Sequence, residues 1–301
     1  MTESAMRAVK ENGLALQSSP FINDKEVVMA AVYQNGLTLQ FASDELKDDK
    51  EVVMTAVKND SRALQFALKH DKEVVMAAVQ KYGLSLRFSA FQDREVVMAA
   101  VQKDGFALAY APAFQTDREV VMAAVKQFGE VLKFAPAFQD DREIVMEAVK
   151  KFGYALKFAP AFQSDREIGI AAAKSFGLVI LHVPFFQTDR EIVMIAVKKD
   201  GRALEHAPLF QSDKEIVMAA VKKTGMVLKY APAFQDDPEV VMAAVKQDPN
   251  ALEFVSESQY DLAISVRKEP CEVLKNIIQL LNEYPKVNNC ILNDIRGLPM
   301  K

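Results

Sequence analysis

A motif of about 24 residues recurs along most of this chain and constrains its fold more than any other feature. The clearest copies read D-[RK]-E-[VI]-V-M-A-A-V-K, then a glycine, then A-L-x-F-A-P-A-F-Q. Successive copies begin 25, 22 and 22 residues apart, and then 24 residues apart six times. A fixed period in this range is typical of stacked supersecondary units, so the sequence predicts a repeat architecture. The copies open at Asp24, Asp49, Asp71, Asp93, Asp117, Asp141, Asp165, Asp189, Asp213 and Asp237.

Each copy begins with the signals of a helix. The segment Thr116-Asp117-Arg118-Glu119 fits a capping box, in which the threonine hydroxyl caps the helix and the glutamate reaches back to the cap. Pro238 favours a second register, with the aspartate as cap and the proline at the first helical position. Both registers predict a helix over residues 120–128, apolar on most sides, as expected for a helix between two neighbours.

A glycine ends this helix, and a shorter helix follows it. Nine of the eleven glycines occupy the same slot, where we expect the left-handed conformation that closes a helix. Residues 130–135 are predicted to form the short helix, because Pro136 disfavours its continuation. Leucine-rich repeats have a similar period, but they need L-x-x-L-x-L and an asparagine ladder, which this motif lacks.

The predicted fold is therefore all-α: a right- or left-handed α-solenoid of two-helix repeats with helical caps. Residues 1–260 are predicted to form one array of about ten or eleven units. Residues 261–301 are predicted to form a C-terminal helical cap packed on the last repeat, with a partner-docking or secretion tail as the alternative.

Composition narrows the functional classes. The net charge of −4 argues against a general nucleic-acid or anionic-membrane surface. The two cysteines, Cys271 and Cys290, do not suggest a disulfide scaffold. The N-terminus lacks the apolar core of a signal peptide, and the longest strongly apolar stretch, residues 177–186, is too short to span a bilayer. We expect a soluble, cytoplasmic protein, with secretion into a host cell without a signal peptide as the alternative.

The segments DREVVMAAVK, the glycine and A-L-x-F-A resemble a repeat family catalogued as domain of unknown function 4116. The resemblance covers roughly residues 2–260. It implies no catalytic residues. It does imply relatives among intracellular bacteria, including effector-like proteins of Legionella and its relatives, and among some protists and algae. The A-P-A-F-Q loop from Ala111 onward departs from the usual family loop, so loop contacts known elsewhere need not transfer.

Two sets of side chains could form sites. His182 and His206 occupy a slot that is otherwise aromatic; with Glu205 they could form a weak metal site, but zinc usually takes three or four ligands. We interpret them as substituted aromatic positions and predict no metal or cofactor. A methionine fills one helical slot in ten copies, which suggests an adaptable groove or, as we expect, stacked core. These residues are Met6, Met29, Met54, Met76, Met98, Met122, Met146, Met194, Met218 and Met242.

The D-[RK]-E triplets are expected to form a solvated edge. Arg118, Arg142, Arg166 and Arg190 could each pair with carboxylates of neighbouring copies, although exposed pairs of this kind contribute little individually.

The copy that opens at Asp165 departs from the motif. Gly169 and Ile170 replace valine and methionine. Large apolar side chains replace small or polar ones nearby and in the next copy, at Leu181, Val183, Phe185 and Ile195. Such a patch suggests a partner-binding surface. Local repacking around the missing side chain of Gly169 is the alternative.

No nucleophile–base pair or paired carboxylates can be argued, so we predict no enzymatic activity. The expected function is a protein–protein interaction scaffold, such as a bacterial effector or an intracellular adaptor, that binds another protein or peptide. Two alternatives stay open: a helical repeat protein that binds RNA or another nucleic acid, and a purely structural subunit of a larger assembly. Lysines recur at one position of the short helix, but Leu181 and Glu205 interrupt that row.

Overall fold

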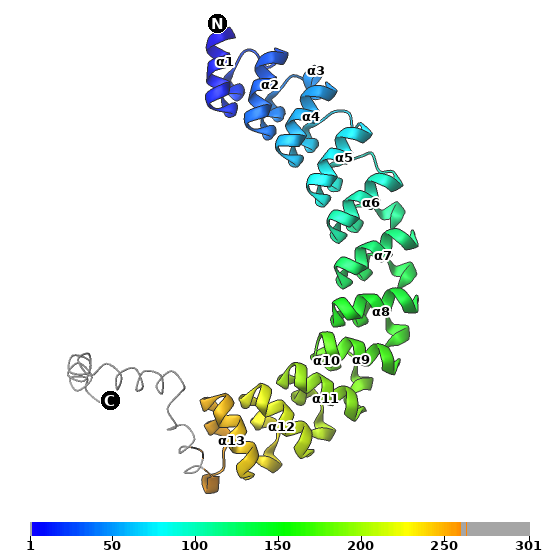
Figure 1. Ribbon diagram of the computed structural model, residues 1–301, viewed down its shortest axis with the longest axis vertical. Coiled ribbons are helices and arrows are strands. Elements are labelled where there is room, and N and C mark those ends of the chain that lie inside the picture. Colours follow the sequence, from blue (N-terminus) through cyan, green and yellow to red (C-terminus); the bar gives the residue numbers. More distant parts are fainter. Residues whose placement is uncertain (1, 260–262, 264–301) are drawn as a thin grey trace, which may run out of the picture. The chain divides into compact units, whose positions relative to one another are not determined.

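The computed structural model describes residues 2–259 and 263, and within them it contains helices and no strands (Figure 1). The predicted cap over residues 261–301 lies almost wholly outside the described residues. The chain divides into two compact units, Met1–Phe186 and Gln187–Lys301, which are described separately. The prediction of one array over residues 1–260 stays a prediction.

The first unit contains eight α-helices of ten residues. They are α1 (Thr2–Glu11), α2 (Lys25–Gln34), α4 (Lys50–Asn59), α5 (Lys72–Lys81), α6 (Arg94–Lys103), α7 (Arg118–Gln127), α8 (Arg142–Lys151) and α9 (Arg166–Ser175). The second unit has three more among the described residues: α11 (Arg190–Lys199), α12 (Lys214–Lys223) and α13 (Pro238–Gln247). There are also two four-residue helices, α3 (Asp44–Lys47) and α10 (Val179–His182).

The second helix of each copy is a six-residue 3-10 helix rather than an α-helix. These are η1 (Gly13–Ser18), η2 (Gly36–Phe41), η3 (Ser61–Phe66), η4 (Gly83–Phe88), η5 (Gly105–Tyr110), η7 (Gly129–Phe134), η9 (Gly153–Phe158), η12 (Gly201–His206), η14 (Gly225–Tyr230) and η16 (Pro249–Phe254). A 3-10 turn follows in the later copies: η6 (Pro112–Phe114), η8 (Pro136–Phe138), η10 (Pro160–Phe162), η11 (Pro184–Thr188), η13 (Pro208–Phe210) and η15 (Pro232–Phe234). In the copy that opens at Asp165, α10 replaces the six-residue 3-10 helix.

The aspartate caps the long helix, as the register of Pro238 suggested. Asp117 accepts hydrogen bonds from the backbone N–H groups of Glu119 at 3.0 Å and Val120 at 3.1 Å. The capping box that places Thr116 at the cap is therefore wrong. A carboxylate at this position both satisfies free N–H groups and places negative charge at the positive end of the helix dipole.

The glycine that follows most of the long helices allows close packing, and the expected left-handed conformation is wrong. No described residue has a positive φ, glycines included. A methyl group on Gly201 would lie 2.5 Å from the carbonyl oxygen of Ala220, in the next long helix. The next helix thus runs against the bare backbone, and only glycine leaves room for it.

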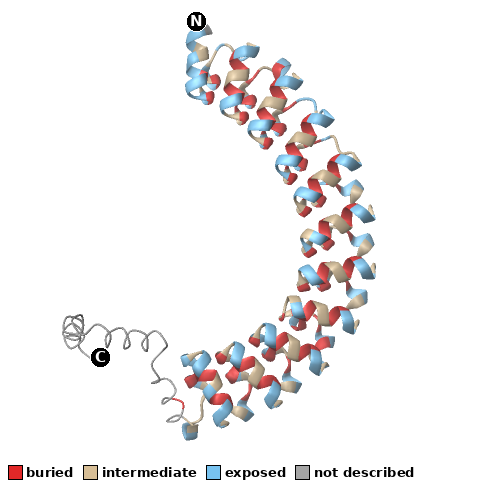
Figure 2. Cartoon of the chain, viewed as in Figure 1, coloured by how far each residue is buried: buried red, intermediate tan, exposed pale blue. Residues whose placement is uncertain are grey.

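Within each unit every long helix packs on the next, and the 3-10 helices form a second layer that does the same. Figure 2 shows buried residues on the parts of the helices that face one another. In α12 the buried side is Ile216, Val217, Ala220 and Val221, and Leu228 of η14 closes the core beneath. Gly201 of the preceding copy packs against the backbone carbonyl of Ala220. These contacts confirm the all-α solenoid of tandem repeats.

None of the helices in the described part of the chain combines the length and the apolar character that a membrane span requires.

Candidate binding surface

One face of each long helix stays open to solvent. In α12 this face carries Glu215, Met218, Ala219 and Lys222, which follow the i, i+3, i+4, i+7 spacing of one helical side. The methionine slot lies on this face in all ten copies, and none of the ten methionines is buried. The expectation that the methionines form stacked core is therefore wrong. The valines and the second alanine fill the core instead.

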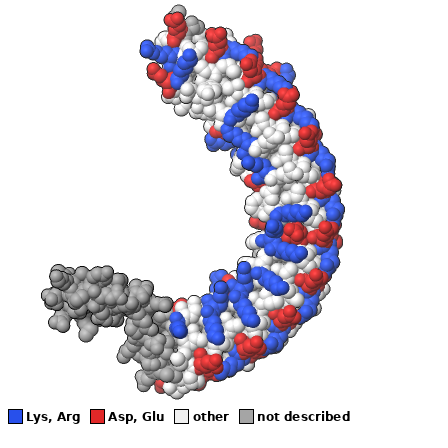
Figure 3. Space-filling view, viewed as in Figure 1, with Lys and Arg blue, Asp and Glu red and all other residues white. Residues whose placement is uncertain are grey.

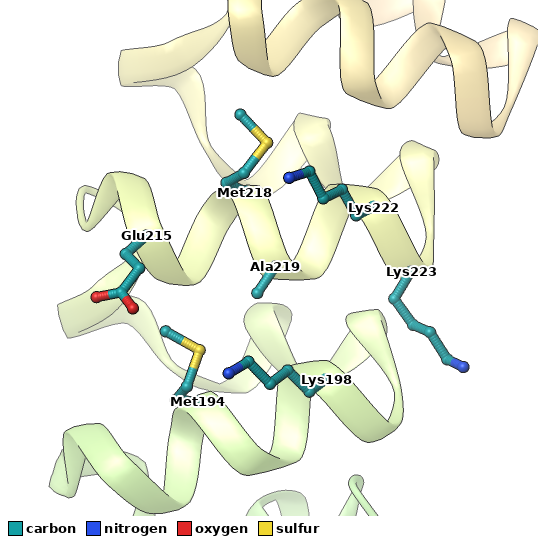
Figure 4. A pocket seen from close by; sticks show the side chains of 7 residues that line it. All are labelled: Met194, Lys198, Glu215, Met218, Ala219, Lys222 and Lys223. Atoms are coloured by element: carbon teal, nitrogen blue, oxygen red, sulfur yellow. The ribbon is translucent and has the colours of Figure 1, made fainter.

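The open faces of neighbouring helices enclose shallow grooves. Between α11 and α12 the groove holds about 460 Å³, with Met194, Met218 and Ala219 as its apolar floor. Figure 4 shows Lys198 and Lys222 beside these methionines and Glu215 at the other end of the helix. A similar groove of about 390 Å³ lies between α8 and α9, lined by residues that include Met146 and Ile170. The same shape therefore occurs in both units, because the motif repeats its open face.

Charges at the N-terminal ends of the long helices neutralise one another. Arg190 pairs with Asp213 at 2.8 Å and with Glu215 at 2.7 Å, both in the next copy. The hydrogen bond from Arg190, helped by the backbone N–H of Ile216, holds the pKa of Asp213 below its ordinary value. Arg118 and Arg142 make the same pairs with the copies that follow them, as predicted.

Lysines at the C-terminal ends are not neutralised in this way. Lys198, Lys222 and Lys223 line the α11/α12 groove, and within the described residues none of them forms an ion pair or hydrogen bond. The single carboxylate of the groove, Glu215, is already paired with Arg190. Lys223 also attracts Asp200 at longer range, but Asp200 is held by Arg202 at 2.7 Å. Figure 3 shows acidic side chains interleaved with basic ones along one edge of the visible face, and long basic side chains away from that edge.

The deviating copy is repacked, as the alternative interpretation proposed. A methyl group on Gly169 would lie 2.5 Å from Cζ of Phe186, so this ring occupies the space that a valine fills in sister copies. Phe186 is fully buried, whereas the phenylalanines in the same slot of other copies, such as Phe138, are not. Val183 is only 1% exposed. Its assignment to the surface patch is therefore wrong, because this side chain belongs to the repacked core.

The other three predicted site residues reach solvent. Leu181 is 44% exposed and Phe185 is 60% exposed, both in the first unit. Ile195 is half-buried in α11 of the second unit, next to Met194 on the open face. Their role in partner binding stays a prediction. Of the four, Ile195 is the one that lies on the repeated groove-bearing face.

His182 packs as an aromatic residue. Its ring packs edge-on against Tyr154, with 4.7 Å between the ring centroids. Tyr154 also packs edge-on against Phe176, with 6.0 Å between their centroids. Among residues 2–259 and 263 no group of three or more His, Cys, Asp or Glu side chains could hold a metal ion. The geometry around His182 agrees with a substituted aromatic position.

The sequence contained the signal for the open face. Glutamate, methionine, a small residue and lysine recur at i, i+3, i+4 and i+7, which is one side of a helix. The predicted helix is apolar on most sides, whereas this stripe has a charged residue at each end. The stripe marks the surface, and the flanking valines mark the core.

A family model described as Domain of unknown function (DUF4116) matches residues 3–47, 24–69, 49–91, 93–139, 141–187, 189–233 and 213–258. The chain belongs to this family. Six of the seven DUF4116 matches begin at a cap aspartate, and each spans about two copies of the motif, so the family unit is a pair of copies. No curated protein and no solved structure shows significant similarity to the chain.

Proposed function

We propose that this chain is a non-enzymatic protein-binding scaffold and that the open face of its long helices is the binding surface. One observation carries the proposal: ten methionines at the same helical position are left out of the fully buried core, nine of them half-buried and Met242 exposed. A half-buried methionine leaves part of its apolar surface in contact with water, and its flexible side chain adapts to different apolar partners.

A protein partner fits this face better than a nucleic acid. The grooves have apolar floors without aromatic side chains, whereas proteins that bind single strands usually present aromatic rings on which bases stack. The net charge of −4 also opposes a polyanion that contacts the whole chain. The proposed cytoplasmic location, or export into a host cell, stays a prediction.

Position-specific photo-crosslinking tests the proposal. A photoreactive amino acid replaces Ala219 in the α11/α12 groove or, as control, the exposed Ala233 in the loop of the same unit. After irradiation in lysate of cells that contain the protein, we expect discrete protein adducts from position 219 that an excess of unlabelled chain suppresses. Equal adducts from both positions, or adducts with RNA only, would contradict the proposal.

A further inference from the structure

We propose that the partner segment is an acidic amphipathic helix and that it docks across α11, α12 and α13. This inference rests on the proposed function and adds the chemistry of the partner. It follows from how two rows of side chains run across consecutive copies.

Methionines and lysines form two parallel rows in the second unit. Each long helix places its methionine four residues before its lysine: Met194 and Lys198, Met218 and Lys222, Met242 and Lys246. Four residues advance a helix by about 6 Å, so the two rows lie roughly that far apart. A segment that crosses the helices therefore meets an apolar row on one side and a cationic row on the other.

The spacing of the rows matches a helical partner. Packed helices lie about 8–10 Å apart, which sets the distance between successive lysines of the row. Seven residues of a partner helix advance about 10.5 Å, so carboxylates repeated every seven residues stay close to register over three copies. An apolar stripe beside these carboxylates would then rest on Met194, Met218 and Met242.

The charge state of the groove selects an acidic partner. Lys198, Lys222 and Lys223 have no ion pair among the described residues, and Glu215 is already held by Arg190. A carboxylate that enters from a partner would not have to displace an existing pair. Exposed ion pairs contribute modestly one by one, so a row of them serves mainly to set register and orientation.

The face of α11 to α13 suits this partner better than the matching face of the first unit. Ile195 adds apolar surface beside Met194, whereas the same slot of α8 holds the acidic Glu147. Lys223 lines the α11/α12 groove, whereas the matching residue of the α8/α9 groove is Ser175, whose hydroxyl already accepts from Gly153 N–H at 3.1 Å. The substitution to isoleucine thus falls on a face that is more apolar and more cationic than the face of α8 and α9.

The test uses the full chain and a labelled peptide of about 18 residues, long enough to cross three helices. The peptide carries leucines on one stripe and glutamates every seven residues beside it. Fluorescence anisotropy should show saturable binding. A peptide of the same composition with the glutamates out of register, and one with lysines in their place, should bind weakly or not at all.

Variants locate the site. We expect the double variant Lys198→Gln/Lys222→Gln to weaken binding about 3–10-fold, as two exposed ion pairs would. Ile195→Ala, which restores the residue of sister copies, should weaken it by a similar factor. Lys229→Gln, the same change in η14 of the same unit, should have no effect. Far-UV circular dichroism checks that each variant keeps its helices.

Three outcomes would overturn the inference. The double variant and Ile195→Ala could bind the peptide as the parent does, the register of the glutamates could have no influence, or a single-stranded oligonucleotide could bind more tightly and lose affinity in the same variants. If position-specific crosslinks at Ala219 persist in these cases, the scaffold stands and only the partner chemistry fails. If the crosslinks lose their position dependence, the proposed function itself fails.

Discussion

The two ends of each long helix connect to the neighbouring copy in different ways. At the N-terminal end ion pairs connect the copies: the cap Asp213 and Glu215 both pair with Arg190 of the preceding copy. At the C-terminal end backbone packing connects the copies: Gly201 lies directly against the carbonyl group of Ala220. Amide side chains add to this end at some junctions, as where Gln127 accepts from Gly105 N–H at 3.1 Å.

This difference explains why lysines can remain unpaired at one end only. The N-terminal charges are used up in holding neighbouring copies together. At the junction of α11 and α12 the glycine contact needs no charge, so Lys198, Lys222 and Lys223 can vary without loosening it and are available to a partner. Lys81 of α5 differs, because its ammonium group donates to the carbonyl oxygens of Lys58 and Asn59 in the preceding copy. Four predictions test this division, and we order them by expected effect.

Acid should destabilise the N-terminal ends most, because it acts on many junctions together. The pKa values of Asp49, Asp93, Asp117, Asp213 and Asp237 are lowered, chiefly by hydrogen bonds from the basic side chain of the preceding copy. A lowered folded-state pKa gives stability that is present above the unfolded value of about 3.9 and is lost as pH falls through the folded value. The melting temperature should therefore be level from neutral pH to about pH 5 and fall steeply below about pH 4. An unchanged melting temperature down to about pH 3 would show that these pairs contribute nothing.

Gly201→Ala should be the most destabilising of the three single substitutions compared. The new methyl group would lie 2.5 Å from the Ala220 carbonyl oxygen and 2.9 Å from Thr224, so two copies must separate. We expect a loss of about 2–3 kcal/mol in the free energy of unfolding, measured by urea titration. Arg202→Ala, at the neighbouring exposed position, is the control; it loses only an exposed ion pair with Asp200 and should cost less than about 1 kcal/mol. A tolerated Gly201→Ala would mean that this end is not held by close packing.

Asp213→Ala should cost about 1–2 kcal/mol, because it removes the helix cap. The carboxylate accepts from Glu215 N–H at 3.0 Å and Ile216 N–H at 3.2 Å. Asp213→Asn keeps an acceptor for these groups and loses mainly the exposed pair with Arg190, so it should cost only a few tenths of a kcal/mol. The same loss in both variants would assign the effect to the ion pair instead of the cap.

Lys222→Gln should leave the free energy of unfolding within about 0.5 kcal/mol of the parent. This lysine is exposed and unpaired among the described residues, so its removal breaks no contact between copies. Urea titration of the variant beside Asp213→Ala gives the comparison directly. A clear destabilisation by Lys222→Gln would show that the lysine row is structural and would remove the main reason to assign it to a partner.

The sequence by itself determined the repeat and the α-helical class, and it located the cap of each long helix to within one residue, whereas the structure decided that Asp117 is the cap. Period, cap aspartate and glycine all act within a few residues, so one copy such as 116–139 is enough to recognise them. The predicted pairs of Arg118 and Arg142 were also confirmed, because a fixed period brings equivalent charges together in every copy. The family resemblance rested on the same local pattern.

Only the tertiary structure decided what each recurring residue is for. The glycine was expected to adopt a left-handed conformation, but it makes room for the helix of the next copy. The methionines were expected in the core and lie on the open face, and Val183 was expected on the surface and lies in the core beside Phe186. Each of these outcomes depends on which neighbour a side chain meets. A repeat defines the residues of one copy, but burial arises where two copies pack together.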